Sequence, residues 1–92
     1  MPNRRVVLLP EVADVLRRLP PEAKRKVRVA LAELRRDPDL GEPLERELAD
    51  MRRLRVGQLR IVYGGSPAGL EVVAIGPRRT IYTELERAAR QR

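Results

Sequence analysis

The chain contains no cysteine, histidine, phenylalanine or tryptophan, and its only aromatic side chains are Tyr63 and Tyr82. Without cysteine, disulfides and thiolate nucleophiles are excluded. Without histidine, the chain lacks the side chain that most often serves as a general base or metal ligand. Zinc sites of the usual Cys/His kind and serine–histidine or cysteine–histidine nucleophiles are therefore excluded. We expect an aliphatic core, no metal site and no small-molecule cofactor.

Long apolar runs are also missing, since no stretch approaches the roughly 18 residues that a membrane-spanning helix requires. The N-terminus does not follow the pattern of a signal peptide. Both features predict a cytoplasmic protein without a membrane partner. The length of 92 residues and the apolar fraction of 42% predict one globular domain, residues 1–92.

Basic side chains exceed acidic ones by 20 to 13, which gives a formal net charge of +7. Residues 1–50 carry 11 basic and 10 acidic side chains, whereas residues 51–92 carry 9 basic and 3 acidic. A basic half of this kind favours a polyanionic partner, usually nucleic acid. The alternative is a preference for arginine in a heat-adapted or GC-rich host, which explains the total better than the asymmetry.

The first half of the chain is predicted to form a strand and two helices. A continuous apolar run predicts a strand over residues 4–9, and its two apolar faces place it in the centre of a sheet. Apolar residues at helical spacing follow on both sides of the breaker Pro20-Pro21. The second helix ends at Asp37-Pro38, because a residue before proline avoids the helical region. Residues 43–50 fit either one helical turn or an irregular approach to the sheet.

The second half is predicted to form a hairpin over residues 52–63 and a strand over residues 70–76. A short extended piece over residues 78–82 and a terminal helix over residues 84–90 follow. The element order is then β-α-α-β-β-β-α. This order is typical of an α+β domain, with a small antiparallel sheet and an N-terminal helical hairpin packed on it.

The hairpin turns at Gly57-Gln58, with glycine at the first central position, as a type II′ turn requires. The resulting register places Arg55 opposite Arg60. Like charges directly opposite each other destabilise a sheet by roughly 0.2–1 kcal/mol, and an anion between them would offset this. Phosphate fits the planar fork of arginine best. Side chains alternate between the two faces of a strand. One face of the hairpin therefore carries the aliphatic residues Leu54, Val56, Leu59 and Ile61. The other face carries Arg53, Arg55 and Arg60.

A second candidate region is the segment of residues 76–82. Consecutive antiparallel strands are usually neighbours, so the end of the last strand brings Arg78 and Tyr82 toward the arginine face. Arginines would neutralise the charge that develops on a phosphate during cleavage, and Tyr82 is a candidate for proton exchange. On RNA the internal 2′-hydroxyl is the nucleophile, so the reaction requires neither metal nor histidine. Tyr82 is also compatible with a simple packing role.

Other polar residues have plainer interpretations. Tyr63 shares the face of Leu59 and Ile61 and is expected to pack, and Arg52 on the same face is expected to be structural. Paired carboxylates can perform acid–base chemistry or bind metal. The acidic residues of the chain's middle alternate with Arg46, which indicates solvated charge; they are Glu42, Glu45, Glu47 and Asp50.

Residues 54–63, Leu-Arg-Val-Gly-Gln-Leu-Arg-Ile-Val-Tyr, resemble the signature hairpin of the RelE/ParE toxin superfamily of bacterial and archaeal toxin–antitoxin pairs. Residues 75–82, Ile-Gly-Pro-Arg-Arg-Thr-Ile-Tyr, resemble the closing glycine-x-arginine…tyrosine segment of that superfamily. The helical hairpin that ends at Asp37-Pro38, followed by residues 41–44, also fits. The resemblance covers nearly the whole chain and implies a RelE-like fold.

The resemblance also implies a function, because the RelE branch cleaves mRNA in the ribosomal A site. It implies a type II toxin that inhibits translation as an mRNA endoribonuclease. Its implied partners are a cognate antitoxin protein, mRNA in the ribosomal A site and ribosomal RNA. The residue roles carried over place Arg60 and Arg78 at the transition state, Tyr82 in acid–base chemistry, and Arg53, Arg55 and Arg79 on the RNA backbone.

The chain departs from the superfamily pattern at the hairpin tip. Leu59 stands where many relatives have an aromatic residue, and Gln58 where many have an acidic one. Lysines of strongly active relatives are arginines here, and arginine holds its proton too tightly for acid–base work. Catalysis would then depend more on Tyr82. Two alternatives stay open: a ParE-like protein that poisons DNA gyrase without cutting RNA, and a basic RNA-binding or interaction module.

Overall fold

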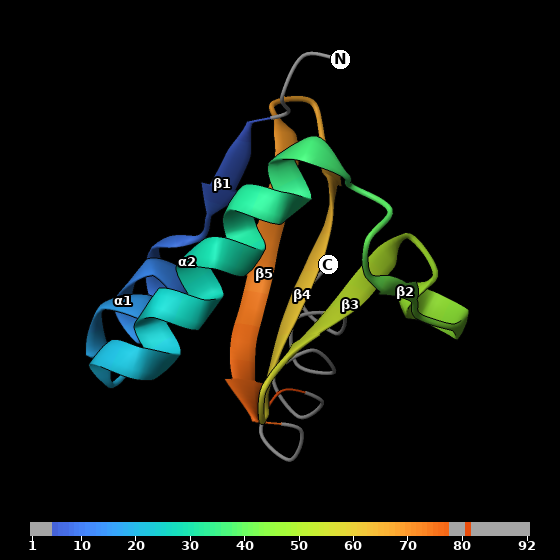
Figure 1. Ribbon diagram of the computed structural model, residues 1–92. Coiled ribbons are helices and arrows are strands. Elements are labelled where there is room, and N and C mark those ends of the chain that lie inside the picture. The colour runs from blue at the N-terminus through green and yellow to red at the C-terminus, as the bar shows by residue number, and fades with distance from the viewer. Residues whose placement is uncertain (1–4, 78–80, 82–92) are drawn as a thin grey trace.

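Two α-helices pack on one face of a five-stranded sheet in the computed structural model, which describes residues 5–77 and residue 81 (Figure 1). The strand order across the sheet is β1-β5-β4-β3-β2. The predicted α+β class, with a helical hairpin on a small sheet, is confirmed. The terminal helix predicted for residues 84–90 lies outside the described residues. The strands are β1 (Val6–Leu8), β2 (Glu42–Pro43), β3 (Met51–Val56), β4 (Leu59–Ser66) and β5 (Gly69–Pro77).

The opening strand lies at an edge of the sheet, so the prediction that it is central is wrong. Within the described residues β1 pairs only with β5, in parallel, with Val6 opposite Leu70 and Leu8 opposite Val72. The sheet is therefore mixed, and the longer β5 takes the place beside β4. The apolar run of β1 has another cause, because Val6 and Leu8 pack on the core beneath the helices.

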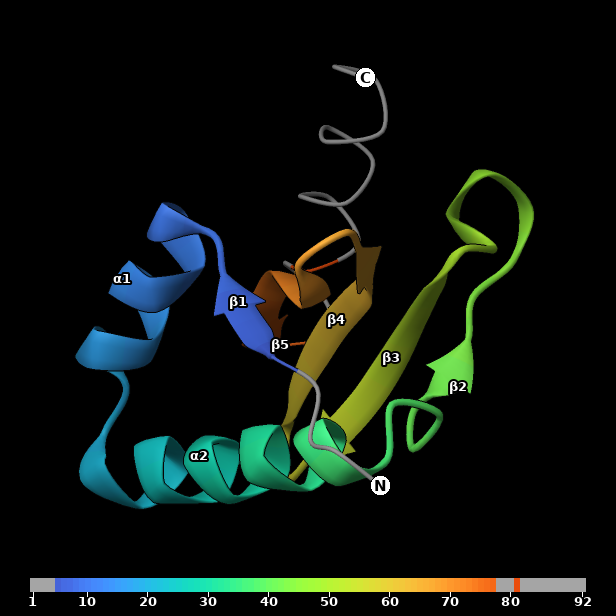
Figure 2. The same cartoon turned by 90° about the horizontal axis from the view of Figure 1, so that it is seen from above.

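The helices α1 (Pro10–Arg18) and α2 (Pro21–Arg36) cover the same face of the sheet (Figure 2). Each begins with proline, whose fixed φ and missing N–H suit the first turn of a helix. Each buries one apolar stripe, with Val12 on α1 and with Val27 and Leu34 on α2. Neither of these described helices has the length and apolar character needed to cross a membrane. The sheet residues buried beneath them are Ile61, Tyr63, Leu70, Val72 and Ile75.

The β3–β4 hairpin has the predicted register, with Arg55 opposite Arg60 and Val56 opposite Leu59. Gly57 has a φ of 60°, and Gln58 is not among the described residues with positive φ. This combination matches a type II′ turn, in which only the first central residue has positive φ. The turn therefore sets which side chains of the hairpin face the helices.

Residues 42–50 contain the short strand β2 and a 3-10 helix, η1 (Arg46–Leu48), which settles an ambiguity of the sequence. They lie against the sheet face that points away from α1 and α2. That face carries a second, smaller apolar cluster, so the centre of β4 is buried on both sides. The cluster consists of buried Met51, Val62, Ala74 and Ile81, with Leu44, Leu48 and Val73 packed against them.

Candidate functional site

Three arginines of the hairpin lie on the sheet face that points away from the helices, as predicted. Arg53 is opposite Val62, and Val62 belongs to the second cluster on that face. Arg60 is two residues from Val62 on β4, and Arg55 is directly across from Arg60. The alternation of a strand thus places the three side chains on one side. We call this surface the arginine face.

The buried member of the arginine face is Arg60, whose exposed fraction is only 9%. Its Nε is fully buried and has no hydrogen-bond partner in the part of the chain that the structure describes. Its Nη1 donates one long hydrogen bond, 3.5 Å, to the carbonyl of Leu59. Among the described residues no carboxylate forms an ion pair with it. A buried charge without an acidic partner costs free energy, so this guanidinium is not explained by stability and is a strong candidate for binding an anion.

The three arginines of the arginine face differ in depth. Arg55 is exposed, whereas only 25% of the Arg53 side chain is accessible to solvent. Arg53 Nη2 lies 3.0 Å from a carboxylate oxygen of Glu42, which is opposite it on β2. The sequence does not predict this ion pair, because a strand of two residues is too short to show the alternation of polar and apolar side chains. In the described part of the chain no group of three potential ligands could hold a metal ion.

The candidate residues Arg78, Arg79 and Tyr82 lie outside the described residues, so their positions stay predictions. Two described residues lie on either side of positions 78–80. Pro77 ends β5 opposite Leu59, next to the pair of Arg60 and Gly76. Ile81 is fully buried in the second cluster, on the same side of the sheet as Arg60.

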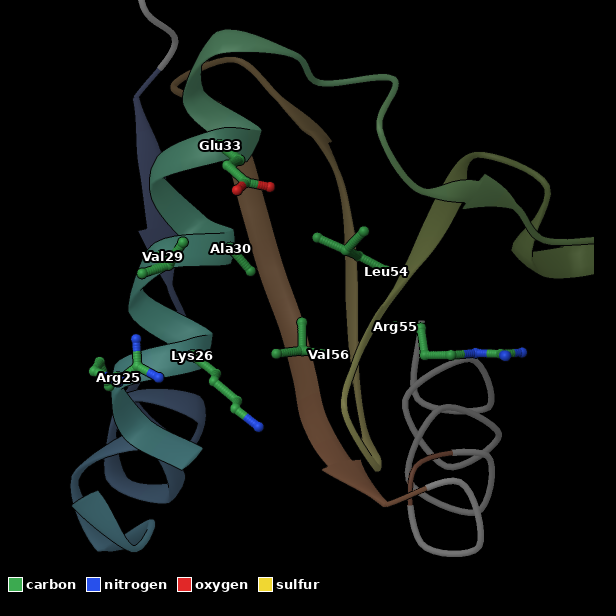
Figure 3. A pocket seen from close by; sticks show the side chains of 8 residues that line it. All are labelled: Arg25, Lys26, Val29, Ala30, Glu33, Leu54, Arg55 and Val56. Carbon is green, nitrogen blue, oxygen red and sulfur yellow. The ribbon is translucent and has the colours of Figure 1, made fainter. Parts of the chain in front are cut away.

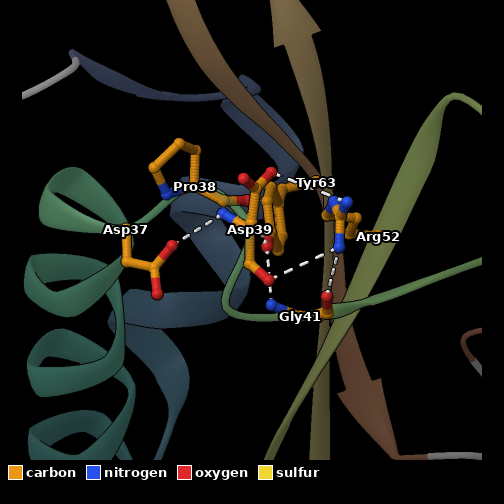
Figure 4. A network of polar contacts seen from close by, with 6 residues as sticks. All are labelled: Asp37, Pro38, Asp39, Gly41, Arg52 and Tyr63. Carbon is orange, nitrogen blue, oxygen red and sulfur yellow. Dashed lines mark hydrogen bonds and ion pairs between the residues drawn. The ribbon is translucent and has the colours of Figure 1, made fainter.

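Tyr63 is buried on the helix side and connects β4 to the loop after α2 (Figure 4). Its hydroxyl donates to the carbonyl of Pro38 at 2.8 Å and accepts from the N–H of Gly41 at 2.9 Å. Arg52 donates to the carbonyl of Gly41 at 2.7 Å and forms an ion pair with Asp39 at 3.5 Å. The predicted packing role of Tyr63 and structural role of Arg52 are confirmed. Together they hold the loop that leads into β2.

A family model for the ParE toxin of the type II toxin–antitoxin system parDE matches residues 6–82. The chain belongs to this toxin family. The match spans both helices and all five strands of the toxin. It confirms the predicted membership of the RelE/ParE superfamily. No curated protein sequence matches the chain.

Solved structures similar to the toxin are of RelE proteins. The RelBE2 toxin–antitoxin complex from Mycobacterium tuberculosis is 27% identical, with a TM-score of 0.73, over 85% of this chain and 100% of that one. An archaeal RelE–RelB complex from Pyrococcus horikoshii OT3 is 22% identical, with a TM-score of 0.66, over 83% and 96% of the two chains. A free E. coli RelE with two arginines replaced by alanine is 19% identical, with a TM-score of 0.73, over 95% and 98%. The last two comparisons show the shared fold alone.

A groove of about 280 Å³ lies between α2 and β3 on the other side of the toxin (Figure 3). Leu54 and Val56 line it from β3, whereas the side chain of Arg55 points away from α2. Among the described residues β2 pairs only with Arg52 and Arg53, so the outer edge of residues 54–56 has no strand beside it. The groove and the arginine face therefore meet at Arg55, which also lines the groove, and otherwise lie on the two sides of β3.

Burial raises the pKa of the Tyr63 hydroxyl above its ordinary value of 10.0, against the lowering effect of the Gly41 hydrogen bond. Above pH 10.0 Tyr63 ionises in the unfolded chain but stays protonated in the folded toxin. The free energy of unfolding should therefore be highest below this pH and fall as the pH rises toward the raised folded-state pKa. Urea titrations of the wild type and Tyr63→Phe at increasing pH measure this. The free energy of unfolding should fall less steeply with pH in Tyr63→Phe than in the wild type. An equal fall in both proteins would show that Tyr63 does not cause it.

Proposed function

We propose that the toxin is a ribosome-dependent mRNA endoribonuclease. The observation that carries the proposal is Arg60, a buried guanidinium with an unpaired Nε and no acidic partner among the described residues. The exposed guanidinium of Arg55 lies across the strand from it. Two like charges in this arrangement favour an anionic ligand, and an RNA phosphate supplies oxygen acceptors for both forks.

The proposed reaction is the attack of an internal 2′-hydroxyl on the adjacent phosphorus. The new bond closes a 2′,3′-cyclic phosphate, and the bond to the 5′-oxygen of the next nucleotide breaks. Tyr82 exchanges the proton that moves from the nucleophile to the leaving oxygen. Arg60 and Arg78 stabilise the negative charge that builds on the phosphate oxygens, which is usually the largest contribution to such catalysis. Arg53, Arg55 and Arg79 hold the RNA backbone.

The path of the chain supports a site shared by β4 and residues 78–82. Ile81, the residue directly before Tyr82, is buried in the second cluster, on the same side of the sheet as the arginine face. This supports the proposal that Arg78 and Tyr82 act together with Arg60.

The proposed partners are mRNA in the ribosomal A site, ribosomal RNA and a cognate antitoxin protein. The antitoxin is supported by the M. tuberculosis relative, which was solved as a toxin–antitoxin complex. The ribosome supplies what the arginine face lacks, because this small surface offers little groove to hold a free RNA. The basic excess of +7 favours both RNA partners.

A second candidate function is inhibition of DNA gyrase without RNA cleavage. The observation that favours it is the family match itself, since the model that matches residues 6–82 describes the parDE toxin. The aliphatic Leu59 at the hairpin tip, half-buried beside Arg60, also offers no aromatic ring on which a base would stack.

A translation reaction with purified ribosomes and mRNA separates these functions. The wild-type toxin should produce new mRNA 5′ ends, and Arg78→Ala and Tyr82→Phe should each reduce their formation by about 100-fold or more. The control is Arg28→Ala, which removes the same charge from the exposed side of α2 and should cut normally.

Other outcomes identify the alternatives. Intact mRNA together with accumulated gyrase–DNA cleavage complexes would replace the endoribonuclease with the gyrase inhibitor. Intact mRNA and unaffected gyrase, with harmless expression in the absence of an antitoxin, would indicate a basic RNA-binding module. Normal cleavage by both variants would show that residues 78–82 do not belong to the site.

A further inference from the structure

We propose that Glu42 is a positioning residue on the arginine face, where its carboxylate holds Arg53 in the free toxin and is exchanged for an RNA phosphate on binding. The inference rests on the proposed function, since it takes RNA as the ligand. It assigns a role to an acidic residue that the sequence alone indicates to be solvated charge.

The two partners of this ion pair differ in how firmly they are held. Arg53 Nη2 and the Glu42 carboxylate lie 3.0 Å apart, and the exposed fractions of the two side chains are 25% and 76%. The guanidinium of Arg53 is therefore largely covered by protein, whereas the carboxylate of Glu42 is surrounded by solvent. Exchange moves the acidic side chain alone and leaves the arginine in place.

The backbone of Glu42 is fixed on both sides, so the fold sets the point from which its side chain reaches Arg53. Before it, the N–H of Gly41 donates to the Tyr63 hydroxyl at 2.9 Å. After it, the N–H of Leu44 donates to the carbonyl of Met51 at 3.0 Å. These bonds hold a two-residue strand whose first member faces Arg53 directly.

A hollow of about 280 Å³ next to this pair has room for a phosphate group. Arg53 and Arg55 line it together with Glu42, Leu40, Gly41 and Leu54. A phosphate oxygen and a carboxylate oxygen are equivalent acceptors for the guanidinium fork. An RNA phosphate in the hollow would therefore replace Glu42 at Arg53 and also approach Arg55.

The exchange gives the site selectivity. While the carboxylate is in place it cancels the charge of Arg53 and repels an approaching anion. A single small anion gains little by displacing it, whereas an RNA backbone that also contacts Arg55 and Arg60 gains several charge-assisted bonds. Glu42 thus weakens the binding of any one phosphate in favour of ligands with several.

Binding of a short oligouridylate, measured by fluorescence anisotropy over a series of salt concentrations, tests the proposal. Glu42→Gln should bind about two- to fivefold more tightly than the wild type. The plot of log affinity against log salt concentration should be steeper by up to about 0.7, because the carboxylate displaced in the wild type takes up a cation and offsets the release of one counterion from the RNA. The matched control is Glu45→Gln, which makes the same charge change at an exposed position of the same loop and should show neither effect.

A second pair of proteins isolates the role of Arg53. In the Arg53→Gln background, Glu42→Gln should change neither affinity nor salt dependence, and thermal unfolding should show that all variants are folded. Equal binding by Glu42→Gln and Glu45→Gln, with RNA bound by the wild type, would overturn the inference and leave the proposed function standing. Weaker binding by Glu42→Gln would also overturn it. Absence of binding by every protein would overturn the inference alone, since the proposed cleavage takes place on the ribosome.

Discussion

Arg60→Met is expected to reduce mRNA cleavage by about 100- to 1000-fold while the free energy of unfolding stays equal or rises. The loss follows from the proposed role of Arg60, whose guanidinium would stabilise the charge that develops on the phosphate. The stability follows from burial, because Arg60 is 9% exposed and no described residue forms a hydrogen bond with its Nε. An unbranched apolar side chain of similar length removes an unsatisfied charge, and such replacements are often neutral or stabilising. Cleavage in the purified translation reaction and urea denaturation measure the two effects.

Because cleavage is expected to fall while stability is kept or rises, Arg60→Met distinguishes a functional role of this residue from a structural one. A structural role would predict that activity and stability fall together. Arg60→Lys separates charge from shape, since lysine keeps the positive charge but lacks the planar fork; it should retain part of the activity. Cleavage at the wild-type rate by folded Arg60→Met would remove this residue from the site.

Gly41→Ala is expected to destabilise the toxin by about 1–3 kcal/mol, the usual cost of overpacking. A Cβ at this position would lie 2.8 Å from the carbonyl oxygen of Arg53 and 2.9 Å from the Tyr63 hydroxyl. Relief of these contacts requires β3 or the loop to move, and either movement disturbs the hydrogen bonds that Tyr63 makes. Thermal unfolding should show a lower Tm, by about 4–8 °C for each kcal/mol lost.

The matched control for Gly41→Ala is Gly65→Ala. A Cβ at Gly65 would meet nothing within 4 Å, and its φ is not in the region that favours glycine. Its Tm should therefore stay close to that of the wild type, within about 0.5 kcal/mol of stability. Equal Tm values for both variants and the wild type would show that the loop adapts to the extra methyl group.

Local chain geometry was enough to predict much of the fold. The Gly57 turn and the two-residue period of the strands placed Arg53, Arg55 and Arg60 on one face, and the register confirms it. Prolines at the helix starts and the breaker at Asp37-Pro38 set the two helices. Each of these features is decided by residues close together in the chain, so it can be read without knowing the rest of the structure.

Contacts between distant segments could not be predicted in this way. The apolar run of β1 suited either a central strand or a half-buried edge strand, and only its parallel pairing with β5 decides between them. The hydrogen bonds of Tyr63 join positions 22 and 25 residues apart. The Glu42–Arg53 pair depends on a strand of two residues, too short for a sequence pattern.

The sequence by itself determined which arginines share a side of the sheet, because alternation along a strand is a property of the local backbone. Only the tertiary structure decided how deep each of them lies and which acid each one meets. Arg60 is buried with no carboxylate partner among the described residues, Arg53 is bound to Glu42, and Arg55 is exposed. Depth and pairing depend on which segments pack together in space, and no period along the chain encodes that.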